Sequence, residues 1–344
     1  MALVARCAIA ATLVAALLGA AGCGGGASQV SDAGAAGTGA AGSGGSAGTG
    51  AMAGASGSAG RGGTGVAGSG AGGVPIAGTD GGTRPCPGAK PDATNTGVPA
   101  GVTLTVVNQD VTVAQDNTTI DAQDIHGFLI IQASHVHVTR SIVRGRATDS
   151  NAGVINVKSG TDVVIEDTEI AVASPSATVD GMWGQNFIAR RMNIHGGVDG
   201  MKADSNDSVE CSYIHDLASF ASDPNQGGGP THNDGIQILS GTGIHIVGNQ
   251  LVAAMDQNAA IQVTQDFGAV SDLHIDSNWA DGGGCTFNFA HKVAASLTVD
   301  TSNNRFGRNS FYDCPILKST QTTLVSSGDV WDDDGTPVPV QTHD

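Results

Sequence analysis

Three aspartates in the middle of the chain, each followed by glycine, have a spacing that points to chemistry. Asp180, Asp199 and Asp234 recur at steps like those of a repeat that runs along the sequence, so we expect them to stack in one column. Carboxylates stacked at strand spacing cannot all ionise freely, so either one keeps a proton or a cation such as Ca²⁺ lies among them. Lys202 follows closely, and it is a general base if burial lowers its pKa, or otherwise the counterion.

Histidines gather in the same stretch of sequence. His195, His215 and His232 titrate near neutrality and can serve as acid or base. A zinc site built from them is an alternative, although no pair has the helical i, i+4 spacing or the cysteine partners typical of such sites. The candidate substrate-binding residues around them are Trp183, Gln237, Asn233 and Arg144.

A structural interpretation of the aspartates stays open beside the catalytic one. Asp before Gly at a turn often only accepts hydrogen bonds from the turn backbone. Asn and Gln that recur at equivalent positions, such as Gln262 and Asn288, are expected to stabilise stacked strands rather than to react.

The elements that position these residues follow from a short phrase that occurs nine times. It consists of an apolar residue, four mostly polar residues and another small or apolar residue, and its first positions are 18 to 37 residues apart. A period in this range is typical of a solenoid, in which each repeat buries its apolar face on its neighbours. The nine phrases begin at Ile120, Val138, Ile165, Ala189, Val209, Ile246, Ile275, Thr301 and Val325.

Apolar residues alternate within the repeats, which indicates strands with one buried face. A second strand precedes most phrases, as at 129–131, 236–238 and 287–289. Short strands that return in the same order predict parallel stacking, and therefore an all-β, single-stranded parallel β-helix of about nine coils. Aligning the second strands gives one outward column of Asn156, Trp183, Lys202, Gln237, Gln262 and Asn288.

Two further features surround the aspartates. A third column holds residues just beyond each phrase, namely His126, Arg144, Ala171, His195, His215 and Val252. The longest step between phrases contains the insertion 219–230, and insertions between coils commonly build the wall of a binding groove. Arg190 and Arg191 are adjacent on one expected strand and so point to opposite faces, which means that one of them has to be accommodated inward or at an edge.

The first 85 residues form two segments outside the repeats. Residues 1–23 have the pattern of an export signal: Arg6 precedes an apolar run that ends in small residues, and Cys23 stands where a bacterial lipoprotein carries its lipid. Lipidation and simple secretion both remain open. Residues 24–85 are almost entirely Gly, Ala, Ser and Thr, which predicts a flexible linker, and residues 86–344 hold the β-helix domain. We therefore expect an outer-membrane or cell-surface lipoprotein, or otherwise a secreted protein.

Charge and cysteines limit the partners and the cross-links. The chain carries a net charge of −17, and its first 85 residues contain three Arg and two Asp, which leaves −18 for the domain. Such a charge argues against nucleic acid and anionic membranes as partners, apart from a lipid anchor at Cys23. Export permits disulfides. Of Cys86, Cys211, Cys285 and Cys314, the last two lie about one coil apart and are the preferred pair, whereas Cys211 is expected in the core.

The sequence of the central coils resembles that of a group of exported bacterial β-helix proteins of the pectate-lyase-like superfamily. The resemblance rests on IHGGVDGMKA, HNDGIQ and FGRN, and it runs from about Ala93 to Asn309. It implies a right-handed helix and a polysaccharide-cleaving groove along one parallel sheet. Members use Arg or Lys with Ca²⁺ for β-elimination, or paired Asp for hydrolysis. Neither pattern is complete in this chain, since the lyase arginine is not identifiable.

The leading hypothesis is a monomeric, surface-tethered polysaccharide lyase that acts on a glycan containing uronic acid. Ca²⁺ on Asp199 and Asp234, with Asp180 beside them, would neutralise the uronate. Lys202 would take the C5 proton, and His232 or His195 would protonate the leaving oxygen. Hydrolysis by an Asp pair is the variant within the same class. The alternative is a non-catalytic glycan-binding or structural lipoprotein.

Overall fold

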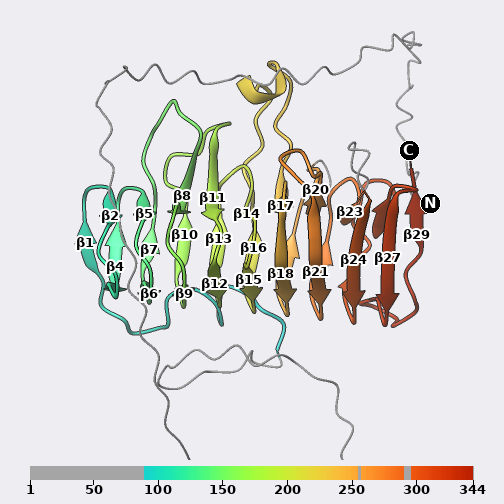
Figure 1. The fold of residues 1–344 in the computed structure, drawn as a ribbon, viewed down its shortest axis with the longest axis horizontal. Coiled ribbons are helices and arrows are strands. Elements are labelled where there is room, and N and C mark those ends of the chain that lie inside the picture. The colour runs from blue at the N-terminus through green and yellow to red at the C-terminus, as the bar shows by residue number, and fades with distance from the viewer. Residues whose placement is uncertain (1–88, 255–256, 290–295, 344) are drawn as a thin grey trace, which may run out of the picture. The chain divides into compact units, whose positions relative to one another are not determined.

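In the computed structural model, the chain forms a right-handed parallel β-helix, and the structure describes residues 89–254, 257–289 and 296–343. Nine coils contribute one strand to each of three sheets, called A, B and C in the order in which the chain visits them, and the last described coil contributes to A and B alone. The coils lie side by side along one axis, from β1 at one end to β28 and β29 at the other (Figure 1). The fold expected from the repeat is therefore confirmed. The residues assigned to the signal and to the linker, and residues 86–88 of the expected domain, lie outside the described residues.

Neighbouring strands in all three sheets are parallel. Sheet A contains β1 (Thr105–Val107), β4 (Gln123–Ile125), β7 (Ile142–Val143), β10 (Glu169–Ala171), β13 (Asn193–His195), β16 (Tyr213–His215), β19 (Gln250–Val252), β22 (Trp279–Asp281), β25 (Arg305–Phe306) and β28 (Val330–Trp331). Sheet B contains β2 (Val111–Val113), β5 (Leu129–Ile131), β8 (Ala152–Val157), β11 (Val179–Gly184), β14 (Met201–Ala203), β17 (Asp234–Ile238), β20 (Ala259–Val263), β23 (Phe287–Phe289), β26 (Ile316–Lys318) and β29 (Val340–Thr342). Sheet C contains β3 (Thr119–Asp121), β6 (His137–Thr139), β9 (Val163–Glu166), β12 (Phe187–Arg190), β15 (Ser208–Glu210), β18 (Gly241–Val247), β21 (Val270–Asp276), β24 (Leu297–Ser302) and β27 (Thr322–Ser327).

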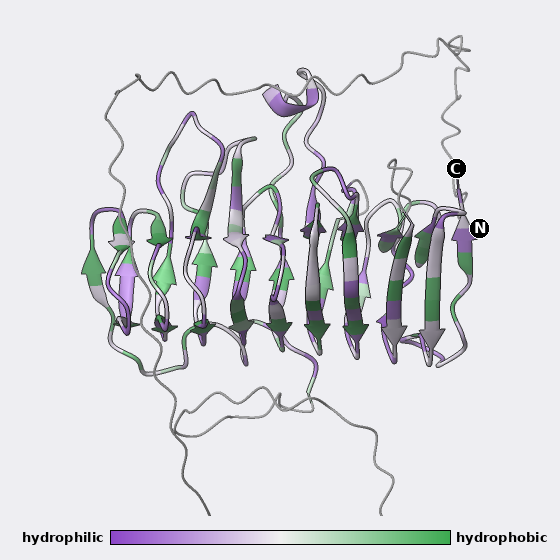
Figure 2. Ribbon diagram, viewed as in Figure 1, coloured by the Kyte–Doolittle hydropathy of each residue, from purple (hydrophilic) through white to green (hydrophobic). Residues whose placement is uncertain are grey.

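The core lies inside the coils, because alternate residues of each strand point inward. Figure 2 shows this alternation as changes between hydrophobic and hydrophilic colour along single strands. Buried aliphatic and aromatic side chains fill the interior, with Ile170, Ile194 and Ile214 stacked in successive strands of sheet A. The repeat phrase is the corner from sheet C to sheet A. The first residues of the phrases, from Ile120 to Thr301, pair with one another in sheet C, as the alignment of the phrases predicts. The last phrase is displaced by one residue, because Thr301 pairs with Ser326 and not with Val325.

Each corner from sheet C to sheet A contains one residue with positive φ, which turns the chain sharply. Arg191 is the corner residue after β12, with φ 52°. This conformation explains how adjacent arginines are accommodated: Arg190 ends the strand, and Arg191 turns back so that its guanidinium donates to Asp167 and Glu166. Neither side chain enters the core, so the inward alternative is wrong, and Arg191 instead lies at the corner that follows β12.

A buried polar column follows these corners, and the sequence analysis did not identify it. Asn249, Asn278 and Asn304 are fully buried. The Oδ1 of each accepts the backbone N–H of the equivalent residue in the preceding coil, which is Ser212 for Asn249, Asn249 for Asn278 and Asn278 for Asn304. Each Nδ2 donates to a backbone carbonyl, at Val209, Ile246 and Ile275 in turn. All three asparagines occupy the fourth position of the repeat phrase. An alignment of the phrases could therefore have predicted this column from the sequence.

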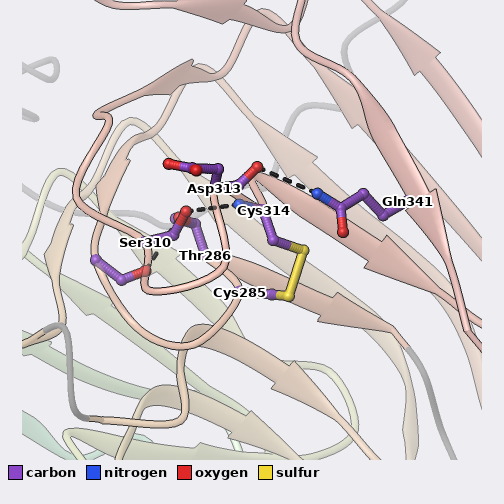
Figure 3. The surroundings of a disulfide bond; sticks show 7 residues. Cys285, Thr286, Ser310, Asp313, Cys314 and Gln341 are labelled. Atoms are coloured by element: carbon purple, nitrogen blue, oxygen red, sulfur yellow. Dashed lines mark hydrogen bonds between the residues drawn. A yellow bond between two sulfur atoms is a disulfide. The ribbon is translucent and has the colours of Figure 1, made fainter. Parts of the chain in front are cut away.

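A disulfide joins two neighbouring coils near the carboxyl end. Cys285 and Cys314 are bonded, as Figure 3 shows, which confirms the expected pair. Ser310 supports the bridge, because its Oγ accepts the N–H of Cys314 at 2.8 Å. Cys211 is buried, as expected, but it is also disulfide-bonded. No helix in the described part of the chain is long and apolar enough to cross a membrane.

Candidate functional site

The three aspartates form the expected column at the entry to sheet B. Asp180 lies in β11, Asp199 lies just before β14, and Asp234 begins β17. The backbone N–H of Asp199 donates to Asp180 Oδ1 at 3.0 Å, and the N–H of Asp234 donates to Asp199 Oδ1 at 2.9 Å. At most 5% of each residue is exposed. One oxygen of Asp180 and one of Asp199 is therefore used to hold the next coil.

The glycine after each aspartate is required by the close approach of successive coils. A Cβ on Gly200 would lie 2.3 Å from Ile214 Cγ2 and 2.6 Å from the carbonyl oxygen of Gly235. A Cβ on Gly181 or Gly235 would likewise lie 2.4 or 2.5 Å from a carbonyl oxygen of the next coil. The Asp-Gly pattern thus has a structural cause, as the structural interpretation expects, but the contacts are with the next coil rather than with the turn.

The second oxygen of each aspartate meets a side chain from the outward column of sheet B. Trp183 Nε1 donates to Asp180 Oδ2 at 2.6 Å, and Gln237 Nε2 donates to Asp234 Oδ2 at 3.1 Å. Lys202 Nζ donates to Asp180 Oδ2 at 2.5 Å and also to Asp199 Oδ2. Trp183, Lys202 and Gln237 each stand three residues after an aspartate that they contact, and Lys202 also reaches Asp180 of the preceding coil. One ammonium thus joins two buried carboxyl groups, and we call Asp180, Asp199 and Lys202 the carboxyl–lysine cluster.

The charges of the cluster set its protonation. Burial, followed by repulsion from Asp180, raises the pKa of Asp199 to about 7, although Lys202 opposes the shift. Burial and the charge of Asp199 raise the pKa of Asp234 well above its ordinary value. Burial alone would lower the pKa of Lys202, but Asp199 and Asp180 outweigh it and raise that pKa. The condition for Lys202 to act as a base is therefore not met, and it is a firmly held cation.

The donor set does not fit Ca²⁺. In the part of the chain that the structure describes, no group of three or more His, Cys, Asp and Glu is arranged to hold a metal ion. The outward oxygens of Asp180 and Asp199 already accept from Lys202, and both oxygens of Asp234 accept from the amides of Asn258 and Gln237. Calcium requires six to eight oxygen ligands. The ammonium supplies the positive charge that the column needs.

The histidines do not meet the aspartates. His195 and His215 lie in sheet A, where their rings stack at 5.2 Å. His195 Nε2 contacts Glu169 Oε1 at 3.0 Å, and His215 contacts Asn193 and Asp216. His232 is exposed in the loop before β17. The hydrogen bonds among the described residues join none of the three to the carboxyl–lysine cluster.

Two of the expected substrate-binding residues have structural partners instead. Arg144 lies beside sheet A, where its Nε donates to Asp124 Oδ1 at 2.6 Å. Asn233 is 1% exposed, and its Nδ2 donates to the carbonyls of Val198 and Ala218, which anchors the inserted loop. That loop contains the short 3-10 helix η1 (Pro224–Gln226) and rises beyond the coils (Figure 1). Asn225 pairs through its side-chain amide with Asn151 of another loop.

Trp183 and Lys202 face a cavity of about 300 Å³ on the outer side of sheet B. Phe267, from the loop between β20 and β21, lines the same cavity, although 80% of it is exposed. Sequence reasoning missed Phe267 because a single aromatic residue in a short loop carries no periodic signal. Polar and charged side chains also line the cavity, among them Asn156, Lys158, Asp204 and Ser240.

No protein-family model matches the chain, and no curated protein or solved structure matches it either.

Proposed function

We propose that this chain is an exported, surface-tethered carbohydrate-active β-helix that hydrolyses glycosidic bonds of a polysaccharide at the outer face of sheet B. The observation that carries the proposal is the carboxyl–lysine cluster beside the cavity. It contains a carboxyl group, Asp199, whose pKa of about 7 leaves it partly protonated at neutral pH. A general acid is most effective when its pKa lies near the working pH. The export and tethering rest on the sequence of residues 1–85.

The chemistry follows from the two carboxyl groups and the ammonium between them. Asp199 donates its proton to the glycosidic oxygen, the carboxylate of Asp180 attacks the anomeric carbon to form a glycosyl ester, and the protonated leaving sugar departs. Both oxygens accept hydrogen bonds from one nitrogen, so they are at most about 6 Å apart, closer to the spacing of retaining than of inverting glycosidases. Water then displaces Asp180 from the anomeric carbon and gives a proton to Asp199, which restores both carboxyl groups.

Hydrolysis has more support than elimination in this site. β-Elimination with Lys202 as the base requires a deprotonated amine, whereas its two carboxyl partners raise its pKa. It also requires a cation at the uronate carboxylate, and the aspartates do not fit Ca²⁺. The chemistry of the cluster therefore points to a carboxylic acid, rather than to an amine and a metal ion.

A non-catalytic glycan-binding protein is the second candidate, and burial favours it. Asp199 is 2% exposed, and Asp180 and Asp199 each use one oxygen to hold the next coil. A substrate reaches these carboxyl groups only if the Lys202 side chain, now 26% exposed, moves aside. If Lys202 stays in place, the cluster acts as a structural clamp beneath a binding surface.

The test is an assay of the mature chain against a panel of polysaccharides, in which new reducing ends and the absorbance of unsaturated products are both measured. We expect the unaltered chain to produce new reducing ends and no absorbance from unsaturated products. We expect the Asp199→Asn variant to produce no new reducing ends. Asparagine can still accept the N–H of Asp234, so the coil contact remains while the proton donor disappears. Asp234→Asn is the matched control in the same column. Absorbance from unsaturated uronates would refute hydrolysis, and binding without products would establish the second candidate.

A further inference from the structure

Phe267 is an exposed aromatic ring on a loop whose backbone is held in place. Its N–H donates to the carbonyl of Leu239 at 3.0 Å, one coil away. Two residues earlier, Gln265 is 2% exposed, and its Oε1 accepts the N–H of Val270 at 3.0 Å, which closes the loop. An 80% exposed phenylalanine contributes little burial to the fold. Its position at the edge of the cavity therefore suggests a role outside folding.

The second aromatic ring of the cavity is also fixed. Trp183 Nε1 donates to the buried Asp180, which sets the orientation of the indole. Gly153 lies opposite Asp180 in the preceding coil, and a Cβ there would come within 2.9 Å of Trp183 Cγ. The absence of a side chain at Gly153 thus makes room for the indole. Lys202 Nζ lies 5.7 Å from the centre of the ring.

Polar groups suited to hydroxyls surround the two rings. Asn156 is the neighbour of Trp183 in the register of sheet B and lines the cavity. Ser240 Oγ donates to Asp204 Oδ2 at 3.2 Å at the same cavity, and that carboxylate can accept from a ligand hydroxyl. Aromatic faces with a few placed polar groups are the usual lining of a small-molecule site.

The charges of the cavity disfavour an anionic ligand. Its lining contains the cations Lys158 and Lys202 and the anion Asp204. Asp180 and Asp199 compensate the charge of Lys202, and the chain as a whole carries −17. None of the described residues that line the cavity is an arginine, the residue best suited to pair with a carboxylate through two bonds. A uronate would therefore find little net positive charge here.

We propose that Trp183 and Phe267 form a subsite that binds an uncharged pyranose unit by stacking against its apolar face, which makes the ligand a neutral polysaccharide. The subsite rests on the proposed function for its location, but it binds whether or not the cluster is catalytic. The rings supply stacking area, while Asn156, Ser240 and Asp204 bond the hydroxyls. Phe267 is the residue whose substitution tests the subsite, because it lines the cavity and takes no part in the hydrogen bonds of the carboxyl–lysine cluster.

The test is the affinity of the mature chain for soluble neutral polysaccharides, a β-glucan, a mannan and a xylan, beside polygalacturonate as the charged comparison. Phe267→Ala is expected to weaken binding of the preferred neutral glycan about tenfold, a typical loss for one aromatic contact. Phe311→Ala is the matched control, because Phe311 is 60% exposed and lies outside the cavity lining. Binding should change little between low and high salt, since no charge pairing is involved.

Three results would overturn the subsite: equal affinity of Phe267→Ala and the unaltered chain, stronger binding of polygalacturonate than of every neutral glycan, or binding to none of the panel. Urea unfolding of both variants confirms that a lost affinity is not a lost fold. Since the readout is binding, an absence of hydrolysis would refute the proposed reaction and leave the subsite intact.

Discussion

Substitution of Lys202 by methionine would remove the ammonium and keep the length of the side chain, so that Asp180 and Asp199 face each other without a cation. Breaking a buried ion pair by removing one partner typically costs about 3–5 kcal/mol of unfolding free energy. The side chains of both aspartates are at most 8% exposed, so water replaces little of the lost interaction. We expect the full cost at pH 8, where ionised carboxylates would be unpaired.

The cost should shrink at lower pH, because the folded protein can then protonate the carboxyl groups. The pKa of Asp199 is already about 7 with Lys202 present, and loss of the cation raises it further. A folded-state pKa above the unfolded value means that the folded state binds more protons between the two values, so stability falls as pH rises through that window. Asp199 is protonated at pH 5 with or without Lys202, so the two chains differ in the protons bound by this group only above about pH 7. Since each pKa unit is worth about 1.4 kcal/mol, the loss at pH 5 should be smaller than at pH 8 by about 1 kcal/mol.

Urea unfolding at pH 5 and pH 8 measures both values. Lys158→Met is the control, because Lys158 lines the same cavity and is exposed. The reasoning is refuted if Lys202→Met costs less than about 1 kcal/mol at pH 8, where a buried ion pair should cost several times more. It is also refuted if the cost is the same at both pH values.

Three other predictions concern the stack. Asn278→Ala leaves the N–H of Asn249 and the carbonyl of Ile246 buried without partners and should cost about 2–5 kcal/mol in urea unfolding, whereas Asn278→Thr should cost less, since a hydroxyl can still accept. Gly200→Ala should cost more than about 3 kcal/mol by thermal unfolding, because its Cβ overlaps Ile214 and Gly235, while Gly229→Ala, whose Cβ meets only one atom at 3.3 Å, should be nearly neutral. Replacing Cys285 and Cys314 by serine reopens a loop of 29 residues and should cost about 3–4 kcal/mol, and an unchanged midpoint would contradict that estimate.

The repeat made most of the fold predictable. Equivalent residues of a solenoid stack one above another, so the alignment of phrases placed Trp183, Lys202 and Gln237 in one column, as the register of sheet B confirms. The same rule placed the aspartates together and brought Cys285 near Cys314. Errors arose where one residue decides the direction of the chain. The positive φ of Arg191 was not visible in the sequence, and it redirects a side chain that alternation alone would have sent inward.

The candidate site was less predictable than the fold, because side chains in the same coil can lie on different sheets. His195 and Asp199 are four residues apart, yet a turn places them on sheets A and B, where they have different partners. Phe267 is distant in sequence from Trp183, and only the three-dimensional path of its loop brings both to one cavity. The pKa of Lys202 depended on the number of carboxyl groups within reach of its nitrogen, which the sequence does not specify.

The structural and catalytic interpretations of the aspartates are compatible, because each uses a different oxygen. Oδ1 of Asp180 and Asp199 accepts a backbone N–H of the next coil, whereas Oδ2 faces the outward column. The contact that stacks the coils thereby fixes the position and burial of the outward oxygen, and burial is the largest cause of the raised pKa of Asp199. Alanine at these positions would remove both roles at once, whereas asparagine keeps the acceptor and removes the ionisable proton. Asparagine variants, rather than alanine variants, therefore separate a column that only holds coils from one that also donates protons.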